Sequence, residues 1–171
     1  MGKQFAKIEP EHRNFIARQK IFFVASAPPK GRINVSPKGL SSFRVLGDND
    51  IAYLDCTGSG SETRAHLMAS DDKRLTIMFC AFEGDPVILR LYGQGQSLTR
   101  GTPEYAALVR KFEEVPGARQ IVRIAVDLVQ TSCGMGVPLF DYKEERGNLV
   151  RYWTTHGIDN LVALYGIESP G

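Results

Sequence analysis

The chain has 171 residues, of which 43% are hydrophobic and 23% charged, and its formal net charge is +2. This length and balance are typical of a globular protein, so we expect a single domain over residues 1–171. The near-neutral charge gives no electrostatic reason to expect nucleic acid or a membrane surface as partner. No apolar run is long enough to span a bilayer, and the charged N-terminus does not resemble a signal peptide, so a cytoplasmic protein is expected.

A short amphipathic helix is expected near residues 9–19, with Pro10 in its first turn, where proline is tolerated. Apolar or alternating segments follow, and turn sequences such as GDND and EGDP separate them. The expected strands lie in KIFFVASA, RINVSPKG, FRVL, IAYLDC, RLTIMFCAF, VILRLYGQGQSL and RQIVRIAVDLVQTSC.

Helices are also expected near residues 61–69 and 102–112, the latter with Thr102 as its N-cap. The tail over about 142–171 predicts two short helices separated at Gly157. Because the strands follow one another as hairpins, the sheet should be mostly antiparallel. Six or so strands with flanking helices predict a mainly β protein of the α+β class, folded as a small closed barrel. A doubly wound parallel sheet is the poorer interpretation.

The loop TGSGSETR, between a strand and a helix, has two interpretations. Ser59 and Glu62 have the spacing of a capping box, in which each side chain binds the other residue's backbone N–H group. The glycines Gly58 and Gly60 also let backbone N–H groups converge on one point, and the helix N-terminus favours an anion. Hydroxyl groups and one cation could then complete a phosphate site; these residues are Ser61, Thr63 and Arg64.

The strand RINVSPKG is the second candidate. Ile33 and Val35 alternate with polar residues, and the basic residues Arg32 and Lys38 flank the strand. The simplest interpretation is an exposed sheet edge with solvated charges. Pro37 lacks an N–H group and ends the ladder, which leaves backbone groups nearby for a planar ligand.

Conventional catalytic and metal sites are weakly represented. Cys56, Cys80 and Cys133 lie in or beside apolar segments and are expected as reduced core residues. The three histidines are dispersed, so no metal site is expected. The sequence GQG at 93–95 lies inside a strand pattern and predicts a β-bulge. Nothing resembles a catalytic triad.

Taken in order, RINVSPKG, IAYLDCTGSGSETRAHL and RLTIMFCAFEGDPVILRLYGQG resemble the pyridoxamine 5′-phosphate oxidase-like family of flavoproteins, over about residues 15–133. The resemblance implies a six-stranded antiparallel split barrel that binds FMN, and a homodimer with FMN at its interface. It also implies that the first segment lies along the flavin ring and that TGSGSETR approaches the phosphate. The cofactor-binding residues expected from it are Arg32, Asn34, Val35, Ser36, Pro37, Lys38, Thr57, Gly58, Ser59, Ser61, Thr63 and Arg64.

The departures from the family pattern concern the substrate. The oxidases of the family carry an Arg-Lys pair where this chain has Glu62-Thr63, and they end in an Arg- and His-containing segment that has no clear equivalent in this chain. We therefore expect a poor pyridoxamine phosphate oxidase.

The leading hypothesis is an FMN-dependent oxidoreductase in which the flavin carries the chemistry, so that no catalytic side chain is assigned. The alternatives are a deazaflavin-dependent reductase, a haem-binding protein and a flavin-binding module without catalysis. Trp153 is expected in the core, and stacking near the flavin edge is the alternative.

Overall fold

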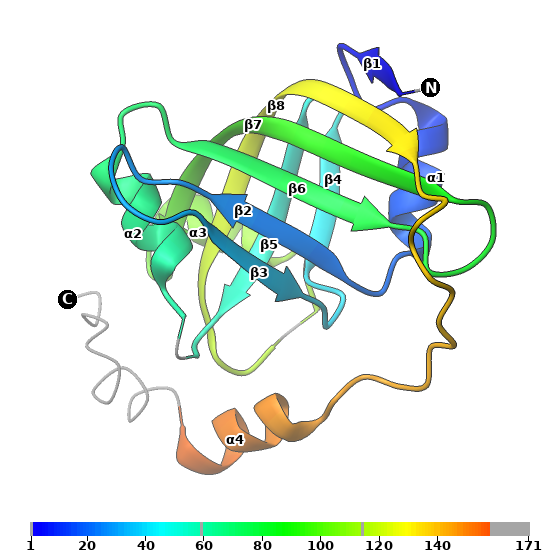
Figure 1. The fold of residues 1–171 in the computed structure, drawn as a ribbon. Coiled ribbons are helices and arrows are strands. Elements are labelled where there is room, and N and C mark those ends of the chain that lie inside the picture. Colours follow the sequence, from blue (N-terminus) through cyan, green and yellow to red (C-terminus); the bar gives the residue numbers. More distant parts are fainter. Residues whose placement is uncertain (1, 59, 114, 158–171) are drawn as a thin grey trace.

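Figure 1 shows a strongly curved sheet with helices around its periphery. The structure is a computed structural model that describes residues 2–58, 60–113 and 115–157. In chain order the elements are β1 (Lys3–Phe5), α1 (Pro10–Arg18), β2 (Phe22–Ser26), β3 (Asn34–Lys38), β4 (Phe43–Gly47), β5 (Asp50–Cys56), α2 (Glu62–Ala69), β6 (Arg74–Cys80), β7 (Val87–Thr99), α3 (Pro103–Val109), β8 (Ala118–Cys133) and α4 (Asn148–His156).

The strands form one antiparallel sheet in the order β3-β2-β6-β7-β8-β5-β4, and β1 pairs with β8 outside this path. The fold class is therefore the one predicted, mainly antiparallel β with flanking helices, and the parallel alternative is wrong. The described residues form eight strands instead of the expected six. All seven apolar segments become strands, and β1 adds an eighth that its three residues are too short to signal.

The sheet curves because β7 and β8 are long and bend together. One half of β8 pairs with β5 and the other half pairs with β1, while β7 follows both halves. The register of β7 and β8 shifts between Tyr92 and Gly93, which is the predicted bulge. A Cβ atom at Gly93 would lie 2.1 Å from the carbonyl oxygen of Ala125, so a side chain cannot be accommodated there.

The barrel is split between β3 and β4, the two ends of the hydrogen-bonded path. Among the described residues, the two strands are joined by a tight turn and not by a ladder. Leu40 and Ser41 in this turn both have left-handed φ angles, 58° and 50°. The hydroxyl group of Ser42 donates to the carbonyl oxygen of Gly39 over 2.7 Å and closes the turn. The split leaves an opening on the barrel interior.

Strand β5 is buried on both faces because it separates two hydrophobic clusters. Ile51 and Tyr53 point into the barrel, where aromatic rings of β2, β4 and β6 meet. Ala52 and Leu54 point to a second cluster beneath α3. Since side chains alternate along a strand, Asp55 lies on the same face as Tyr53 and faces the barrel interior at the end of β5.

The helices lie close to their expected positions. α1 begins at Pro10, and the side chain of Thr102 caps α3 by accepting from the backbone N–H group of Tyr105 over 3.3 Å. α4 ends at Gly157, as expected, and the second helix of the predicted tail lies outside the described residues. In the described part of the chain, every helix is too short to cross a membrane.

The cysteines are free, but only one is a core residue. Cys80 is buried, Cys56 is half-buried and Cys133 is exposed. The expectation that all three are core residues holds for Cys80. It is wrong for Cys56, which is half-buried at the end of β5, and for Cys133, because β8 extends beyond the core before it ends there.

Candidate functional site

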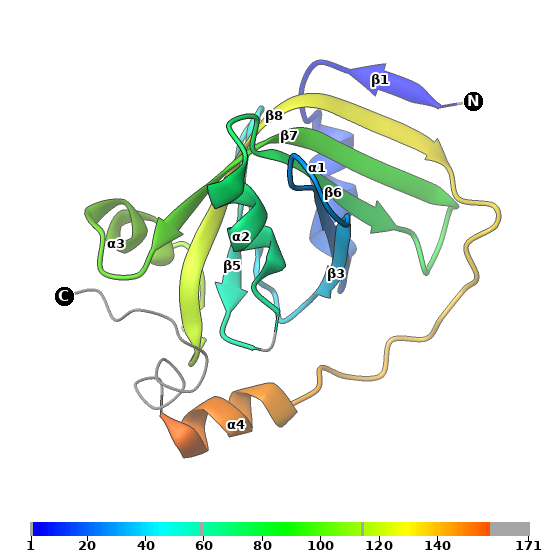
Figure 2. The ribbon, with the colours of Figure 1, turned by 60° about the vertical axis from the view of Figure 1, so that its left-hand side comes forward.

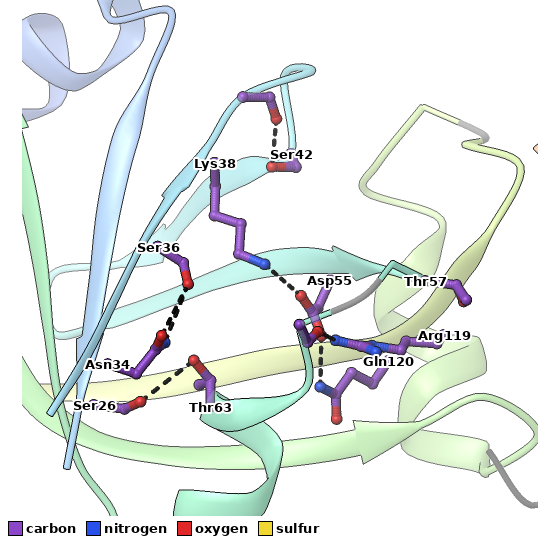
Figure 3. A network of polar contacts seen from close by, with 12 residues as sticks. Ser26, Asn34, Ser36, Lys38, Ser42, Asp55, Thr57, Thr63, Arg119 and Gln120 are labelled. Carbon is purple, nitrogen blue, oxygen red and sulfur yellow. Dashed lines mark hydrogen bonds and ion pairs between the residues drawn. The ribbon is translucent and has the colours of Figure 1, made fainter. Parts of the chain in front are cut away.

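A cavity of about 430 Å³ opens at the split of the barrel. It lies between the end of β3, the end of β5, the beginning of α2 and the beginning of β8 (Figure 3). The lining residues are Ser36, Pro37, Lys38, Gly39, Leu40, Ser42, Leu54, Asp55, Cys56, Thr57, Gly58, Gly60, Ser61, Glu62, Thr63, Val115, Arg119 and Leu149.

A buried carboxylate lies at the centre of this wall. Asp55 is 2% exposed, and one of its oxygens accepts from Nζ of Lys38 over 2.8 Å. The other oxygen accepts from Nε of Arg119 over 2.9 Å and from the side-chain amide of Gln120 over 2.7 Å. Figure 3 shows these side chains converging from β3, β5 and β8. A single group therefore ties the open edge of the barrel to its middle strands.

The charge balance keeps Asp55 ionised. Burial alone would raise the pKa of the Asp55 carboxyl group. The nearby charges of Lys38 and Arg119, with hydrogen bonds from Lys38 and Gln120, outweigh burial and hold the pKa below its ordinary value. Lys38, Arg119 and Asp55 together carry one net positive charge, and Glu62 adds a second carboxylate to the lining.

The loop after β5 is attached to the same network. Nη2 of Arg119 donates to the carbonyl oxygen of Gly60 over 2.6 Å, and the backbone N–H group of Thr57 donates to the carbonyl oxygen of Gly117 over 2.7 Å. α2 begins at Glu62 with Ser61 as N-cap. The capping box predicted for Ser59 and Glu62 is wrong, because a box needs its glutamate at the third helical position and Glu62 is at the first. Ser59 itself lies outside the described residues.

The N-terminus of α2 faces the cavity without a side-chain cap. The hydroxyl group of Ser61 accepts no hydrogen bond from the described N–H groups of the first turn. Thr63, one residue into the helix, is buried, and its hydroxyl oxygen accepts from Ser26 of β2 over 3.4 Å. Neutral donors therefore collect beside the positive end of the helix, an arrangement that suits an anion.

The structure brings seven of the twelve sequence-predicted residues to the cavity. They are Ser36, Pro37, Lys38, Thr57, Gly58, Ser61 and Thr63. Arg32, Asn34, Val35 and Arg64 lie outside the lining of this cavity.

The alternation of β3 explains part of this division. The amide group of Asn34 donates to the hydroxyl oxygen of Ser36 over 3.1 Å, so Asn34 supports the lining without joining it. Val35 is on the opposite face and is 60% exposed. Arg64 is half-buried on α2, one position beyond Thr63, and the cation that the structure supplies to the cavity instead is Arg119.

The family assignment follows from two comparisons. Residues 8–133 match the family model for pyridoxamine 5′-phosphate oxidase. The pyridoxamine 5′-phosphate oxidase family protein ustO from Aspergillus flavus is 39% identical over 186 residues, which cover 90% of this chain and 74% of that protein. The chain belongs to the pyridoxamine 5′-phosphate oxidase family. The resemblance inferred from the sequence is thereby confirmed.

Solved structures share the fold at low sequence identity. The FAD binding protein from Mycobacterium smegmatis superposes with a TM-score of 0.53 at 8% identity, covering 74% of this chain and 96% of that one. The heme storage protein HutZ from Vibrio cholerae gives a TM-score of 0.52 at 18% identity, covering 75% and 98%. Identities this low establish the architecture alone.

Three residues that organise the cavity were not predicted from the sequence, namely Asp55, Arg119 and Gln120. Asp55 follows an apolar run and could have been noticed as a charge at the end of a buried strand. Arg119 and Gln120 lie in a stretch of β8 in which Ala118 to Val122 are all buried, so no alternation marks them. Their approach to Asp55 depends on the pairing of β5 with β8, which the sequence does not show.

Cys56 also lines the cavity, but its thiol is a weak nucleophile. Burial, with a smaller contribution from the Asp55 charge, raises the pKa of the Cys56 thiol to about 12. The thiol is therefore protonated near neutral pH, and we assign it no nucleophilic role.

We predict that Asp55→Asn lowers the free energy of unfolding by about 3 kcal/mol near pH 7, because it leaves Lys38 and Arg119 without their anion. The folded-state pKa of Asp55 lies below its unfolded value of about 3.9. The stabilisation is therefore complete above about pH 4 and is lost as the pH falls through the folded-state pKa. Urea unfolding of the wild type and Asp55→Asn over a pH series measures this stabilisation.

The matched control is Asp50→Asn, in the same strand, where the ion pair with Arg123 is partly exposed. This change should cost less than about 1 kcal/mol. A difference between wild type and Asp55→Asn that stays constant from pH 7 to pH 3 would show that the Asp55 charge does not stabilise the fold.

Proposed function

We propose that this protein is an FMN-dependent oxidoreductase that acts on a small molecule. The observation that carries the proposal is the cavity: in a member of the pyridoxamine 5′-phosphate oxidase family, it joins an uncapped helix N-terminus, hydroxyl donors and two cations at the split of the barrel. Its volume is in the range typical of small-ligand sites. The donor set suits a phosphate group, which needs several N–H or O–H donors and partial positive charge.

Gly58 provides a second observation that supports a ligand in this cavity. Its φ angle lies outside the left-handed region, and a Cβ atom added there would meet nothing within 4 Å. The protein itself therefore has no conformational or packing need for glycine at this position. A side chain would instead occupy space at the cavity wall, which a closely approaching ligand requires to be empty.

In this proposal the residues divide by role. Ser61, Thr63 and the N-terminus of α2 bind the phosphate group, with Lys38 and Arg119 as nearby cations. The bound flavin would supply hydride or electron transfer, which is chemistry that side chains lack. The expectation that Pro37 ends the ladder is wrong, because the pairing of β3 with β2 continues to Lys38. Pro37 and Lys38 both line the cavity, and in this proposal they contact the planar ring. Asp55 holds both cations in place and limits the positive charge of the wall.

A larger groove supports an approach route for the substrate. Its volume is about 1360 Å³, and it runs between α1, the tip of β7 and β8, and the chain that follows β8. The groove and the cavity share five lining residues, Pro37, Lys38, Gly39, Leu40 and Leu149. A substrate in the groove would therefore reach the β3 side of the cavity.

Haem is the less favoured cofactor. Haem iron needs an axial ligand such as histidine, a thiolate or tyrosine. Among the described residues that line the cavity, Cys56 is the candidate, and its raised pKa opposes the thiolate form. A deazaflavin would use the same phosphate donors, and no observation favours it.

We further propose that the active form is a cytoplasmic homodimer with FMN at the interface. Ile33 and Val35 on the outer face of the β3 edge are 72% and 60% exposed, which is unusual for neighbouring β-branched residues. A second subunit covering this edge would also enclose a flavin ring along β3. The three free cysteines suit a reducing compartment.

We expect Gly58→Ala to weaken FMN binding by about 10-fold or more, equivalent to about 1.4 kcal/mol, because the methyl group occupies ligand space. Thermal stability should not change, since the methyl group meets no protein atom. Fluorescence titration of FMN measures the affinity. The control is Gly136→Ala, at a glycine that is equally open but lies outside both cavities. Equal affinities for the two variants would remove Gly58 from the site.

The redox part of the proposal has a separate readout. With FMN bound to wild type, a nicotinamide reductant should bleach the flavin absorbance, and air or an added acceptor should restore it. FMN that binds but is not reduced faster than free FMN would favour the non-catalytic flavin-binding alternative.

For the assembly, light scattering at micromolar protein should give about twice the chain mass of 18.9 kDa. Val35→Glu places a charge on the exposed edge and should shift the mass toward that of the monomer, because burying an unpaired carboxylate is costly. A monomer mass for wild type would rule out the dimer.

A further inference from the structure

α4 reaches the barrel through one aromatic side chain. Within the described span of this helix, Trp153 is the buried residue, with 1% of its surface exposed. The neighbouring Leu149 and Tyr152 are 40% and 36% exposed. Figures 1 and 2 both place α4 at the end of the barrel where β5 ends and α2 begins. The helix is therefore attached beside the candidate cofactor cavity.

Trp153 makes two contacts on the underside of the cavity wall. Its indole Nε1–H donates to the carbonyl oxygen of Thr57 over 2.9 Å in a buried hydrogen bond. Its ring lies against Gly117, where a Cβ atom would be 2.3 Å from Cδ2 of the indole. Gly117 also has a left-handed φ of 88°, so both its backbone and its neighbour demand glycine.

Gly117 and Trp153 hold the backbone of Thr57 on both sides of its Cα atom. Thr57 donates its N–H group to the carbonyl oxygen of Gly117 over 2.7 Å, and its own carbonyl group accepts from Trp153. Both backbone polar groups of Thr57 are thus held by residues distant in the sequence. Thr57 and the next residue, Gly58, line the cavity. Leu149, one helical turn before Trp153, lines it as well.

We propose that Trp153 is a positioning residue for the cofactor cavity, which it serves by fixing the Thr57 backbone and by docking α4 as part of the wall. This inference rests on the proposed function for its ligand, but its geometry does not depend on the ligand. Because coupling between two sites is reciprocal, a phosphate ligand that is held by this loop also stabilises the docked α4.

The segment between β8 and α4 should respond to the same coupling. It crosses the groove with mostly exposed residues and is attached near its start, where the N–H group of Phe140 donates to the carbonyl oxygen of Phe82 over 2.9 Å. Further along, Nζ of Lys20 lies 5.4 Å from the centroid of the Tyr142 ring, and Trp153 forms the attachment at the far end. Loss of the indole contact therefore releases one end of the crossing segment and opens one side of the cavity.

The test compares Trp153→Phe, which keeps an aromatic ring but removes the N–H donor, with Trp153→Ala. Thr155→Ala, on the exposed face of the same helix, is the control. In the absence of ligand, the amide of Thr57 should exchange with deuterium about 5-fold faster in Trp153→Phe and faster still in Trp153→Ala. Amides in the middle of β7 should keep their wild-type rates, which separates local loosening from global unfolding.

The second measurement uses FMN as the probe. Affinity should fall about 5-fold or more in Trp153→Phe and further in Trp153→Ala, and it should stay within about 2-fold in the control. FMN should slow proteolytic cleavage within residues 137–147 of wild type but not of Trp153→Ala. Unchanged Thr57 exchange in both variants would overturn the proposal. If the wild type binds FMN, an FMN affinity that is unchanged in both variants would also overturn it.

The exchange measurement tests the positioning role of Trp153, and the affinity measurement tests FMN as the cofactor. If wild type does not bind FMN, the proposed cofactor is wrong, and the exchange rates still decide the role of Trp153. Faster exchange confined to Thr57 and its neighbours would then support the positioning role for another ligand. Equal exchange in all proteins would overturn it.

Discussion

The structure depends on one buried carboxylate at the mouth of an incomplete barrel. Asp55 accepts hydrogen bonds from β3 through Lys38 and from β8 through Arg119 and Gln120, and it faces the interior because of its place in β5. A split barrel lacks backbone pairing between its two edge strands, so side chains must hold the opening in shape. A network of charged hydrogen bonds does so while keeping polar groups available at the surface of a cavity.

The same network extends into the loop that begins α2 and, through the loop, to α4. Arg119 holds the carbonyl group of Gly60, Gly117 and Trp153 hold Thr57, and the helix N-terminus is left to face the cavity. The arrangement supplies partial positive charge and hydroxyl donors without a large excess of cations, because Asp55 offsets one of the two. Under the proposed function, such a wall would bind a phosphate group.

Local sequence patterns predicted the helices and strands well, but they could not predict contacts between residues that are far apart in the chain. Period-two alternation identified RINVSPKG as a strand, and Thr102 marked the start of α3. The loop TGSGSETR was correctly placed at a helix start. Its cation was sought nearby at Arg64, whereas Arg119 is 64 residues from Asp55 and reaches the cavity only through the pairing of β5 with β8. Trp153 was expected in the core, but its hydrogen bond to a carbonyl group 96 residues away has no local signal.

The central claim is that the cavity beside Asp55 binds the phosphate end of a flavin nucleotide. The most direct test is to compare the affinities of FMN and riboflavin, which share the ring and differ in the phosphate group. Several charge-assisted hydrogen bonds to the phosphate predict that FMN binds about 100-fold more tightly, or better, and that added salt reduces the difference. Equal affinities for FMN and riboflavin would contradict the assignment of this cavity to phosphate.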